Sequence, residues 1–295
     1  MIGTDMTLAL QRNRPARLAS VVMYALCVIF TVCILAVLGI VLAYLVANGW
    51  HSVNWAFFSQ DPEPYGADNY PGGMRNGLVG TTILLALASA VGVPLGMLSG
   101  IFLSEYGSRS RMAKPLRFTA DVLTGVPSIV VGILGYELLV VPLGHFNGWA
   151  GALALAFIMI PIVARTTEEM LRLVPNSYRE ASIALGATKA RTIMKVVLPA
   201  ATGSLITGVM LALARVAGET APLLFTALGS RLLTLNPNYP FPSLTKQVYD
   251  YATGPYTEQK QQAWSGILIL LALIFVFNVS VRLTLRATGR AGRRS

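Results

Sequence analysis

Apolar runs long enough to cross a bilayer recur along this 295-residue chain, and they constrain its fold more than any other feature. A membrane-spanning helix needs about 20 mostly apolar residues, because the hydrocarbon core of a bilayer is about 30 Å thick. Only 12% of the residues are charged, whereas a soluble domain carries about 25%. The runs do not alternate between apolar and polar residues, which excludes an outer-membrane β-barrel. The sequence therefore predicts an all-α, polytopic membrane protein.

We expect six membrane-spanning helices, at residues 21–47, 77–103, 118–141, 149–168, 203–228 and 264–285. Pro127 interrupts the third span and should kink it, because proline has no amide hydrogen to donate within a helix. The spans divide the chain into an N-terminal tail (1–20), a first helix (21–47), an outer loop (48–76), a membrane domain with five further helices (75–287) and a C-terminal tail (288–295).

The positive charges predict how the chain is oriented in the membrane. Of the 23 Lys and Arg residues, 18 fall in the two tails and in the loops that would share their side, and four fall in the opposite loops. Because cytoplasmic loops carry the excess of Lys and Arg, both termini are predicted to be cytoplasmic in a multi-pass inner-membrane protein. The net charge of +10 is thus a topology signal, and no basic face remains for nucleic acid.

Motifs for cofactors and metals are missing from the sequence. No lysine follows a glycine, so the chain has no G-x-x-x-x-G-K-[ST] phosphate loop with which to bind ATP. Cys27 and Cys33 lie in one apolar run, and His51 and His145 lie in outer loops without partners at metal-ligand spacing. We therefore expect no cofactor and no metal site.

A helix–glycine–helix element is predicted in the long cytoplasmic segment between the fourth and fifth spans. Ser177 and Glu180 have the spacing of a capping box, and Gly186 is a suitable helix stop. A small apolar face on the first helix would suit a groove on another protein, although a simple connecting helix would show the same periodicity.

This segment resembles the E-A-A-x3-G-x9-I-x-L-P loop of permeases of ABC importers. The matching positions are Glu180, Ala181, Ser182, Gly186, Val196, Leu198 and Pro199, with serine in place of the second alanine and valine in place of isoleucine. The resemblance implies a type I importer architecture, in which this loop forms a coupling helix that sits in a cleft of a separate ATPase subunit.

Charged residues at membrane depth are the candidate pathway residues. Arg215 lies inside the fifth span with Glu219 four residues later, and Arg165 precedes Glu168 and Glu169 at the inner end of the fourth span. A charge at that depth must pair or face water, and such residues usually mark a substrate route. Mutual neutralisation, or a side chain that reaches the interface, would be structural alternatives.

Residues 214–229, ARVAGETAPLLFTALG, resemble the signature of the PstA type of phosphate permease, in which G-E-T-A-P-L-L is typical. Further likeness lies in 123–130, in 164–170 and in 77–106, which ends in Leu-Ser-Glu-Tyr. The resemblance places Arg165, Glu168, Arg215 and Glu219 in the translocation route. It also implies three protein partners: a second permease of the PstC type, a cytoplasmic ATPase dimer of the PstB type and an extracytoplasmic phosphate-binding protein of the PstS type.

Three other functions stay open on the sequence alone. A guanidinium group can also serve sulfate, molybdate or a phosphonate, so a permease for another oxyanion is the nearest alternative. An intramembrane hydrolase would need a serine and a base at one depth, and no histidine lies in a predicted span. The chain could also serve as a structural partner of another permease.

Overall fold

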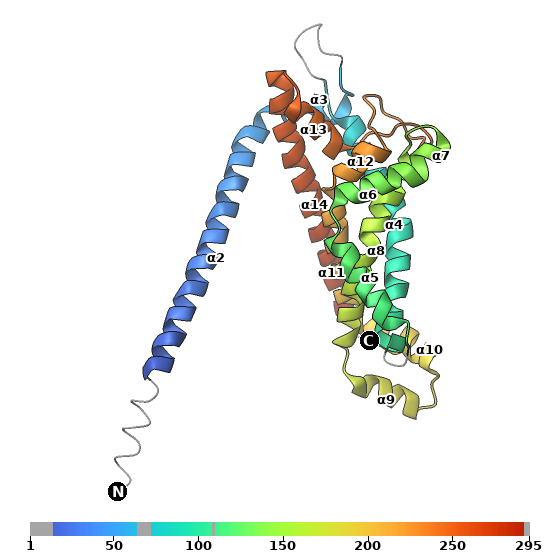
Figure 1. Ribbon diagram of the computed structural model, residues 1–295. Coiled ribbons are helices and arrows are strands. Elements are labelled where there is room, and N and C mark those ends of the chain that lie inside the picture. Colours follow the sequence, from blue (N-terminus) through green and yellow to red (C-terminus); the bar gives the residue numbers. More distant parts are fainter. Residues whose placement is uncertain (1–13, 64–71, 108–109, 292–295) are drawn as a thin grey trace.

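The computed structural model describes residues 14–63, 72–107 and 110–291, and the chain is a bundle of helices within these ranges (Figure 1). The first part of the predicted tail at 1–20 and the end of the tail at 288–295 lie outside the described residues. The helices are α2 (Arg14–Gly49), α3 (Trp55–Ser59), α4 (Arg75–Ile101), α5 (Ala113–Gly125), α6 (Ser128–Gly135), α7 (Val141–Leu143), α8 (Gly148–Arg172), α9 (Asn176–Ala184), α10 (Lys189–Thr192), α11 (Leu198–Ala217), α12 (Ala221–Thr226), α13 (Leu244–Thr253) and α14 (Thr257–Ala291).

Among the described residues, five helical segments are long and apolar enough to span a membrane: 18–52, 75–106, 148–172, 189–217 and 257–281. A bent pair of helices, 113–125 and 128–143, makes a sixth candidate. The predicted all-α, polytopic architecture is confirmed, and two of the six predicted spans need correction.

The third predicted span, 118–141, is not one helix. The chain bends by 101° between the helical segments 113–125 and 128–143. At the bend, Val126 has an extended backbone and Pro127 has non-helical backbone angles. Proline disfavours a helical conformation for the residue before it, so the helix ends at Gly125 and restarts at Ser128.

The fifth predicted span, 203–228, begins earlier and ends earlier than expected. Helical structure runs from Lys189 through the wide turn 193–197 into α11 and stops at Ala217. Gly218 weakens the helix there, and Pro222 favours the start of a new one, because its missing amide hydrogen has no helical partner in the first turn. Residues 221–226 therefore form the separate helix α12.

The centre of the bundle is the contact between α4 and α8. Gly92, Gly96 and Gly100 recur every fourth residue on α4, and a Cβ added at each would lie within 3.0 Å of α8 atoms. The partners of these glycines are Met159, Val163 and the Ala164–Thr167 turn. Small residues at this spacing let two helix backbones approach closely, so α4 and α8 pack as one unit.

The first helix diverges from this bundle. Figure 1 shows α2 leaning away from the other helices and meeting them only near its C-terminal end. There Tyr44 packs edge-on against Trp264 of α14, and the Ser265 hydroxyl donates to the Gly49 carbonyl at 2.5 Å. The rest of α2 is exposed along its apolar length.

The loop 235–256 contains the short helix α13, which was not among the helices predicted from the sequence. Leu244 and Tyr251 of α13 are buried beside Phe57 and Met74, which closes the outer end of the bundle. The seven-residue spacing of Leu244 and Tyr251, two helical turns, was the available signal. Burial raises the pKa of the Tyr251 phenol, which therefore stays protonated at neutral pH.

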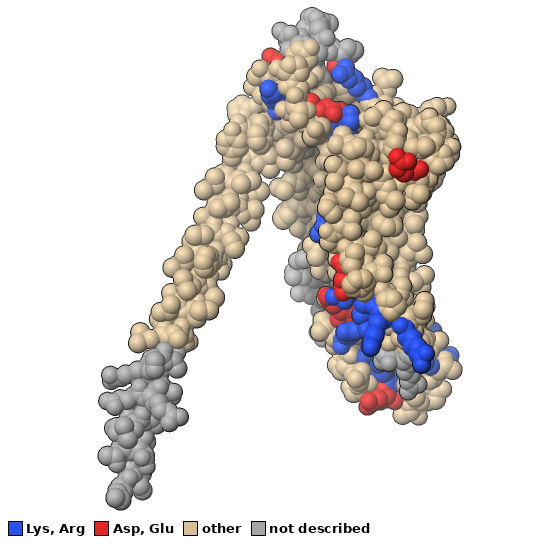
Figure 2. All heavy atoms as spheres, viewed as in Figure 1, with Lys and Arg blue, Asp and Glu red and all other residues tan. Residues whose placement is uncertain are grey.

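Charged side chains gather at the two ends of the bundle, and the band between them is almost entirely uncharged (Figure 2). Basic residues are dense at the end that carries α9 and α10. This distribution is the one expected of a protein whose middle lies in lipid.

The α4–α8 contact predicts that Gly96→Val destabilises the fold. The added Cβ would lie 2.7 Å from the Cβ of Val163, and overpacking of this kind costs about 1–3 kcal/mol. Gly203→Val is the matched control, because nothing lies within 4 Å of a Cβ at that position. Thermal unfolding in detergent should show a lower midpoint for Gly96→Val alone, and equal midpoints for the two variants would contradict the close packing.

Candidate functional site

Two helix breaks meet in one cavity of about 260 Å³. The break between α5 and α6 contributes residues 123–128, and the break after α11 contributes Arg215 and Glu219. Phe157, Ile158 and Ile162 of α8 form the apolar wall. Irregular backbone at membrane depth is tolerated where it lines a water-filled cavity or is buried in protein, so the two breaks identify this cavity as polar space inside the membrane domain.

Arg215 and Glu219 do not neutralise each other in an ion pair, which was the structural alternative to a place on the substrate route. Arg215 lies in the last turn of α11, and Glu219 follows the break, so the two are not on one helix face. Among the described residues, neither side chain has a hydrogen bond or an ion pair. Both line the cavity, which leaves a free guanidinium and a free carboxylate available to a solute.

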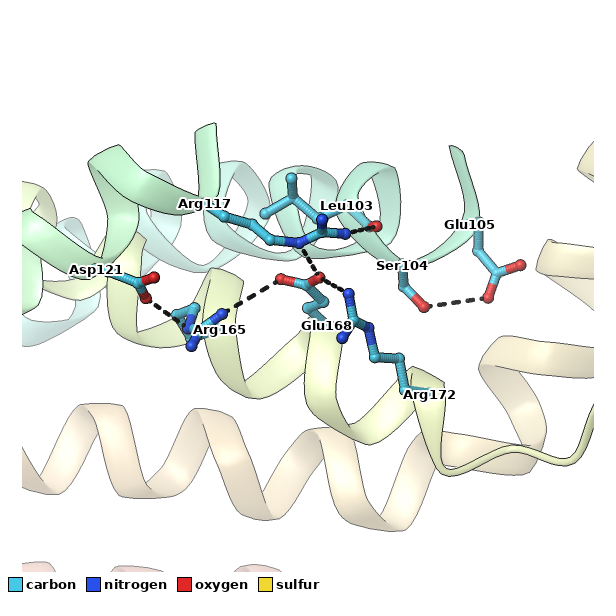
Figure 3. A network of polar contacts seen from close by, with 8 residues as sticks. All are labelled: Leu103, Ser104, Glu105, Arg117, Asp121, Arg165, Glu168 and Arg172. Carbon is cyan, nitrogen blue, oxygen red and sulfur yellow. Dashed lines mark hydrogen bonds and ion pairs between the residues drawn. The ribbon is translucent and has the colours of Figure 1, made fainter. Parts of the chain in front are cut away.

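Glu168 lies at the inner end of α8 among three arginines (Figure 3). Its carboxylate is 1% exposed and accepts from Arg117 Nε and from Arg172 Nη2, each at 2.6 Å. Arg165 Nη1 lies 3.8 Å from the second oxygen, which accepts no hydrogen bond within the described part of the chain. The buried charge is therefore compensated by more than one cation, as burial of a carboxylate requires.

Arg165 is shared between two carboxylates. Its Nε lies 3.0 Å from Asp121 of α5, a closer contact than its 3.8 Å approach to Glu168 (Figure 3). Glu169 was expected beside Arg165, but it is exposed and has no ion pair among the described residues. Arg165 thus ties α5 to α8, in addition to its longer contact with Glu168 within its own helix.

Three members of this cluster were missed in the sequence reading. Arg117 and Asp121 come from α5, and Arg172 lies at the end of α8. The spacing of Glu168 and Arg172, four residues apart on one helix, was a usable signal. Nothing in the sequence indicated the contacts from α5, because they depend on how α5 packs against α8.

The helix α9 in the segment between α8 and α11 begins one residue before the predicted capping box. Pro175 occupies the N-cap position, and no side chain caps the helix. Ser177 therefore lies inside the first turn and makes no capping bond to Glu180, so the capping-box prediction is wrong. Gly186 does end the element, with a φ of +82° that favours glycine because it has no Cβ.

The motif residues of α9 are largely exposed, and the segment that follows contacts α9 and the start of α11. Glu180, Ala181 and Gly186 are exposed, and Leu185 is 89% exposed. The Ser182 hydroxyl lies 2.9 Å from that of Thr192, which joins α9 to α10. At the far end of the motif, Val196 and Leu198 are half-buried and Pro199 is exposed at the start of α11.

The cluster around Glu168 predicts different effects for two adjacent glutamates. Glu168→Gln removes the charge that holds three arginines, and removal of one partner from a buried ion pair costs about 3–5 kcal/mol. Glu169→Gln removes the same charge from an exposed site. We expect a lower thermal midpoint only for Glu168→Gln, measured on the purified protein in detergent, whereas equal midpoints would argue against a stabilising cluster.

Comparisons with known proteins agree with this geometry. The family model described as "Binding-protein-dependent transport system inner membrane component" matches residues 92–290. The "Phosphate transport system permease protein PstA" of Haemophilus influenzae is 42% identical over 82% of this chain and 85% of its own length. A protein of Mycobacterium tuberculosis with the name "Phosphate transport system permease protein PstA 1" is 36% identical over 85% of this chain and 83% of its own length.

A solved structure supports the fold. A chain of the "MetNI methionine ABC transporter" in an inward-facing conformation superposes with a TM-score of 0.58, at 20% sequence identity, over 72% of this chain and 92% of that chain. The resemblance drawn from the sequence and the predicted type I importer architecture are confirmed. This multi-pass inner-membrane protein belongs to the binding-protein-dependent transport system inner membrane components and, among them, to the PstA phosphate transport permease proteins.

Proposed function

We propose that this chain is one of two membrane subunits of an ATP-driven phosphate importer and forms half of its translocation route. The observation that carries the proposal is the cavity where the two helix breaks meet, with Arg215 and Glu219 free to contact a solute. The names of the PstA relatives support phosphate as the substrate.

The chemistry of the cavity supports an oxyanion. A guanidinium presents a planar fork of N–H donors that fits two oxygens of a tetrahedral anion. Glu219 would favour phosphate over sulfate. An ionised carboxylate accepts a hydrogen bond from a protonated phosphate, whereas it repels sulfate, which has no proton at neutral pH. A permease for sulfate, molybdate or a phosphonate is the alternative that Arg215 alone would allow.

Arg165 and Glu168 are proposed as the inner part of the same route. They lie on α8, whose apolar side forms one wall of the cavity. The contact of Arg165 with Asp121 would let an arriving anion compete for the guanidinium.

Substitution of Arg215 tests the substrate role. Arg215→Gln should abolish phosphate uptake by the reconstituted complex, because the anion loses its cation in the route, while the complex still assembles. The control is Arg111→Gln, an exposed arginine outside the cavity. Uptake of radiolabelled phosphate, with sulfate and molybdate as competitors, is the measurement. Normal uptake by Arg215→Gln would contradict the role of Arg215, and equal competition by sulfate would favour the alternative substrate class.

The exposed loop of α9 is proposed as the docking element for a separate ATPase dimer, in keeping with the absence of a phosphate loop from the sequence. In this proposal the chain has no catalytic site of its own. Glu180, Ala181, Ser182 and Gly186 present the docking face, and Val196, Leu198 and Pro199 join it to α11.

Gly186 allows a test of coupling. Gly186→Val forces a β-branched residue into a left-handed conformation, which should displace the end of α9 from the ATPase. We expect ATP hydrolysis to continue and phosphate uptake to fall at least tenfold, whereas Gly203→Val at an exposed position of α11, with nothing within 4 Å of an added Cβ, leaves uptake unchanged. Coupled uptake at the normal rate in Gly186→Val would contradict the docking role.

Orientation and the remaining partners complete the proposal. The start of α2 and the end of α14 point to the same end of the molecule as α9 (Figure 1), which supports cytoplasmic termini together with a cytoplasmic coupling helix. A second permease subunit would complete the route, and an extracytoplasmic phosphate-binding protein would dock at the end formed by α3 and α13.

A further inference from the structure

The inner end of α4 holds the cytoplasmic loop by a buried ion pair. α4 continues into a wide helical turn, Phe102–Tyr106, that carries Glu105. The Glu105 side chain is 5% exposed, and its two oxygens accept from Arg179 of α9, at 2.6 Å from Nη2 and 3.2 Å from Nε. A two-point contact of this kind fixes orientation as well as distance.

Arg179 also fastens α9 to the end of α8. Its Nη2 donates to the Leu171 carbonyl at 2.9 Å, and its Nη1 donates to the Val174 carbonyl at 2.7 Å. These carbonyls lie at the end of α8 and just beyond it, so Arg179 contacts the backbone where α8 ends. One guanidinium therefore joins α4, α8 and α9.

The segment that follows the Gly186 turn also contacts the wide turn 102–106. Lys189 of α10 donates from Nζ to the Glu105 carbonyl, and the same ammonium lies 4.3 Å from the centre of the Tyr106 ring. Both flanks of the loop are thus attached to two consecutive residues of the wide turn that follows α4, so displacement of α9 is expected to displace Glu105 and Tyr106.

The attachment continues to the charge cluster of the route. The Leu103 carbonyl, two residues before Glu105, accepts from Arg117 Nη2 at 2.9 Å, and Arg117 Nε contacts Glu168 at 2.6 Å (Figure 3). Glu168 and Arg165 lie one helical turn apart on α8. An unbroken series of polar contacts thus leads from α9 through residues 103–106 to Arg165.

We propose that residues 103–106, held by Arg179 and Lys189, are a strut that transmits the movement of α9 to the Glu168 cluster, with the Glu105–Arg179 pair as its indispensable positioning contact. The proposal rests on the proposed importer function. Coupling through these contacts is measured as a change at one end when the other end is altered.

The test compares five variants in the complete complex, reconstituted with its ATPase, second permease and binding protein. Glu105→Gln, Arg179→Gln and the double variant each break the pair, and Arg191→Gln removes an equal charge from an exposed position on α10. The measurement is the number of phosphate ions taken up per ATP hydrolysed, with the yield of assembled complex determined in parallel.

We expect the single variants to lower this ratio at least fivefold while hydrolysis continues. The double variant should fall no further, because both changes remove the same contact. Arg179→Lys, which keeps the charge but loses the fork, should recover part of the ratio, and Arg191→Gln should leave it unchanged.

Three results would overturn the strut. The first is a normal ratio of phosphate taken up to ATP hydrolysed in the variants that break the Glu105–Arg179 pair. If less complex assembled but the ratio stayed normal, the pair would only stabilise the fold. An equal fall in Arg191→Gln would show a general effect of charge near the loop. A wild-type complex that carries no phosphate would overturn the proposed function, and the strut with it.

Discussion

The close approach of α4 to α8 is the constraint on which the rest of the structure depends. Gly92, Gly96 and Gly100 leave no room for side chains between the two backbones, so the helices can move only together. This unit presents a wall of the cavity on α8, the Glu168 cluster at its inner end and Glu105 beside α9. A wall of the cavity, the Glu168 cluster and the residues that contact α9 are therefore carried by one packed pair.

The charged residues of the Glu168 cluster and of the cavity differ in whether their charges are compensated by other side chains. Glu168 is buried and surrounded by arginines, so its charge is compensated within the chain. Arg215 and Glu219 have no such partners among the described residues, and both line the cavity where the two helix breaks meet. A cluster whose charges compensate one another can hold helices together, and a pair without such partners suits a place where a solute, water or another subunit supplies them.

The sequence was sufficient for the fold class, the family and the position along the chain of the helix–glycine–helix element, because apolar run length and fixed motif spacing are local properties. It was insufficient where a residue's role depends on tertiary contact. Asp121 was not among the candidate pathway residues, yet it binds Arg165 from α5, and Glu105 was only part of a stretch that resembled the family. The separation of Arg215 from Glu219 was missed because Gly218 and Pro222 were read as part of one helix.

The central claim is that α9 and the inner end of α4 move as one body during transport. The most direct test is the distance between spin labels at Leu98 of α4 and Ser177 of α9, both exposed, in the cycling complex with Cys27 and Cys33 replaced by serine. The account predicts a single narrow distance that is the same without nucleotide and with ATP bound, and a broader distribution in Glu105→Gln. A wild-type distance that shifts between the two nucleotide states would contradict it.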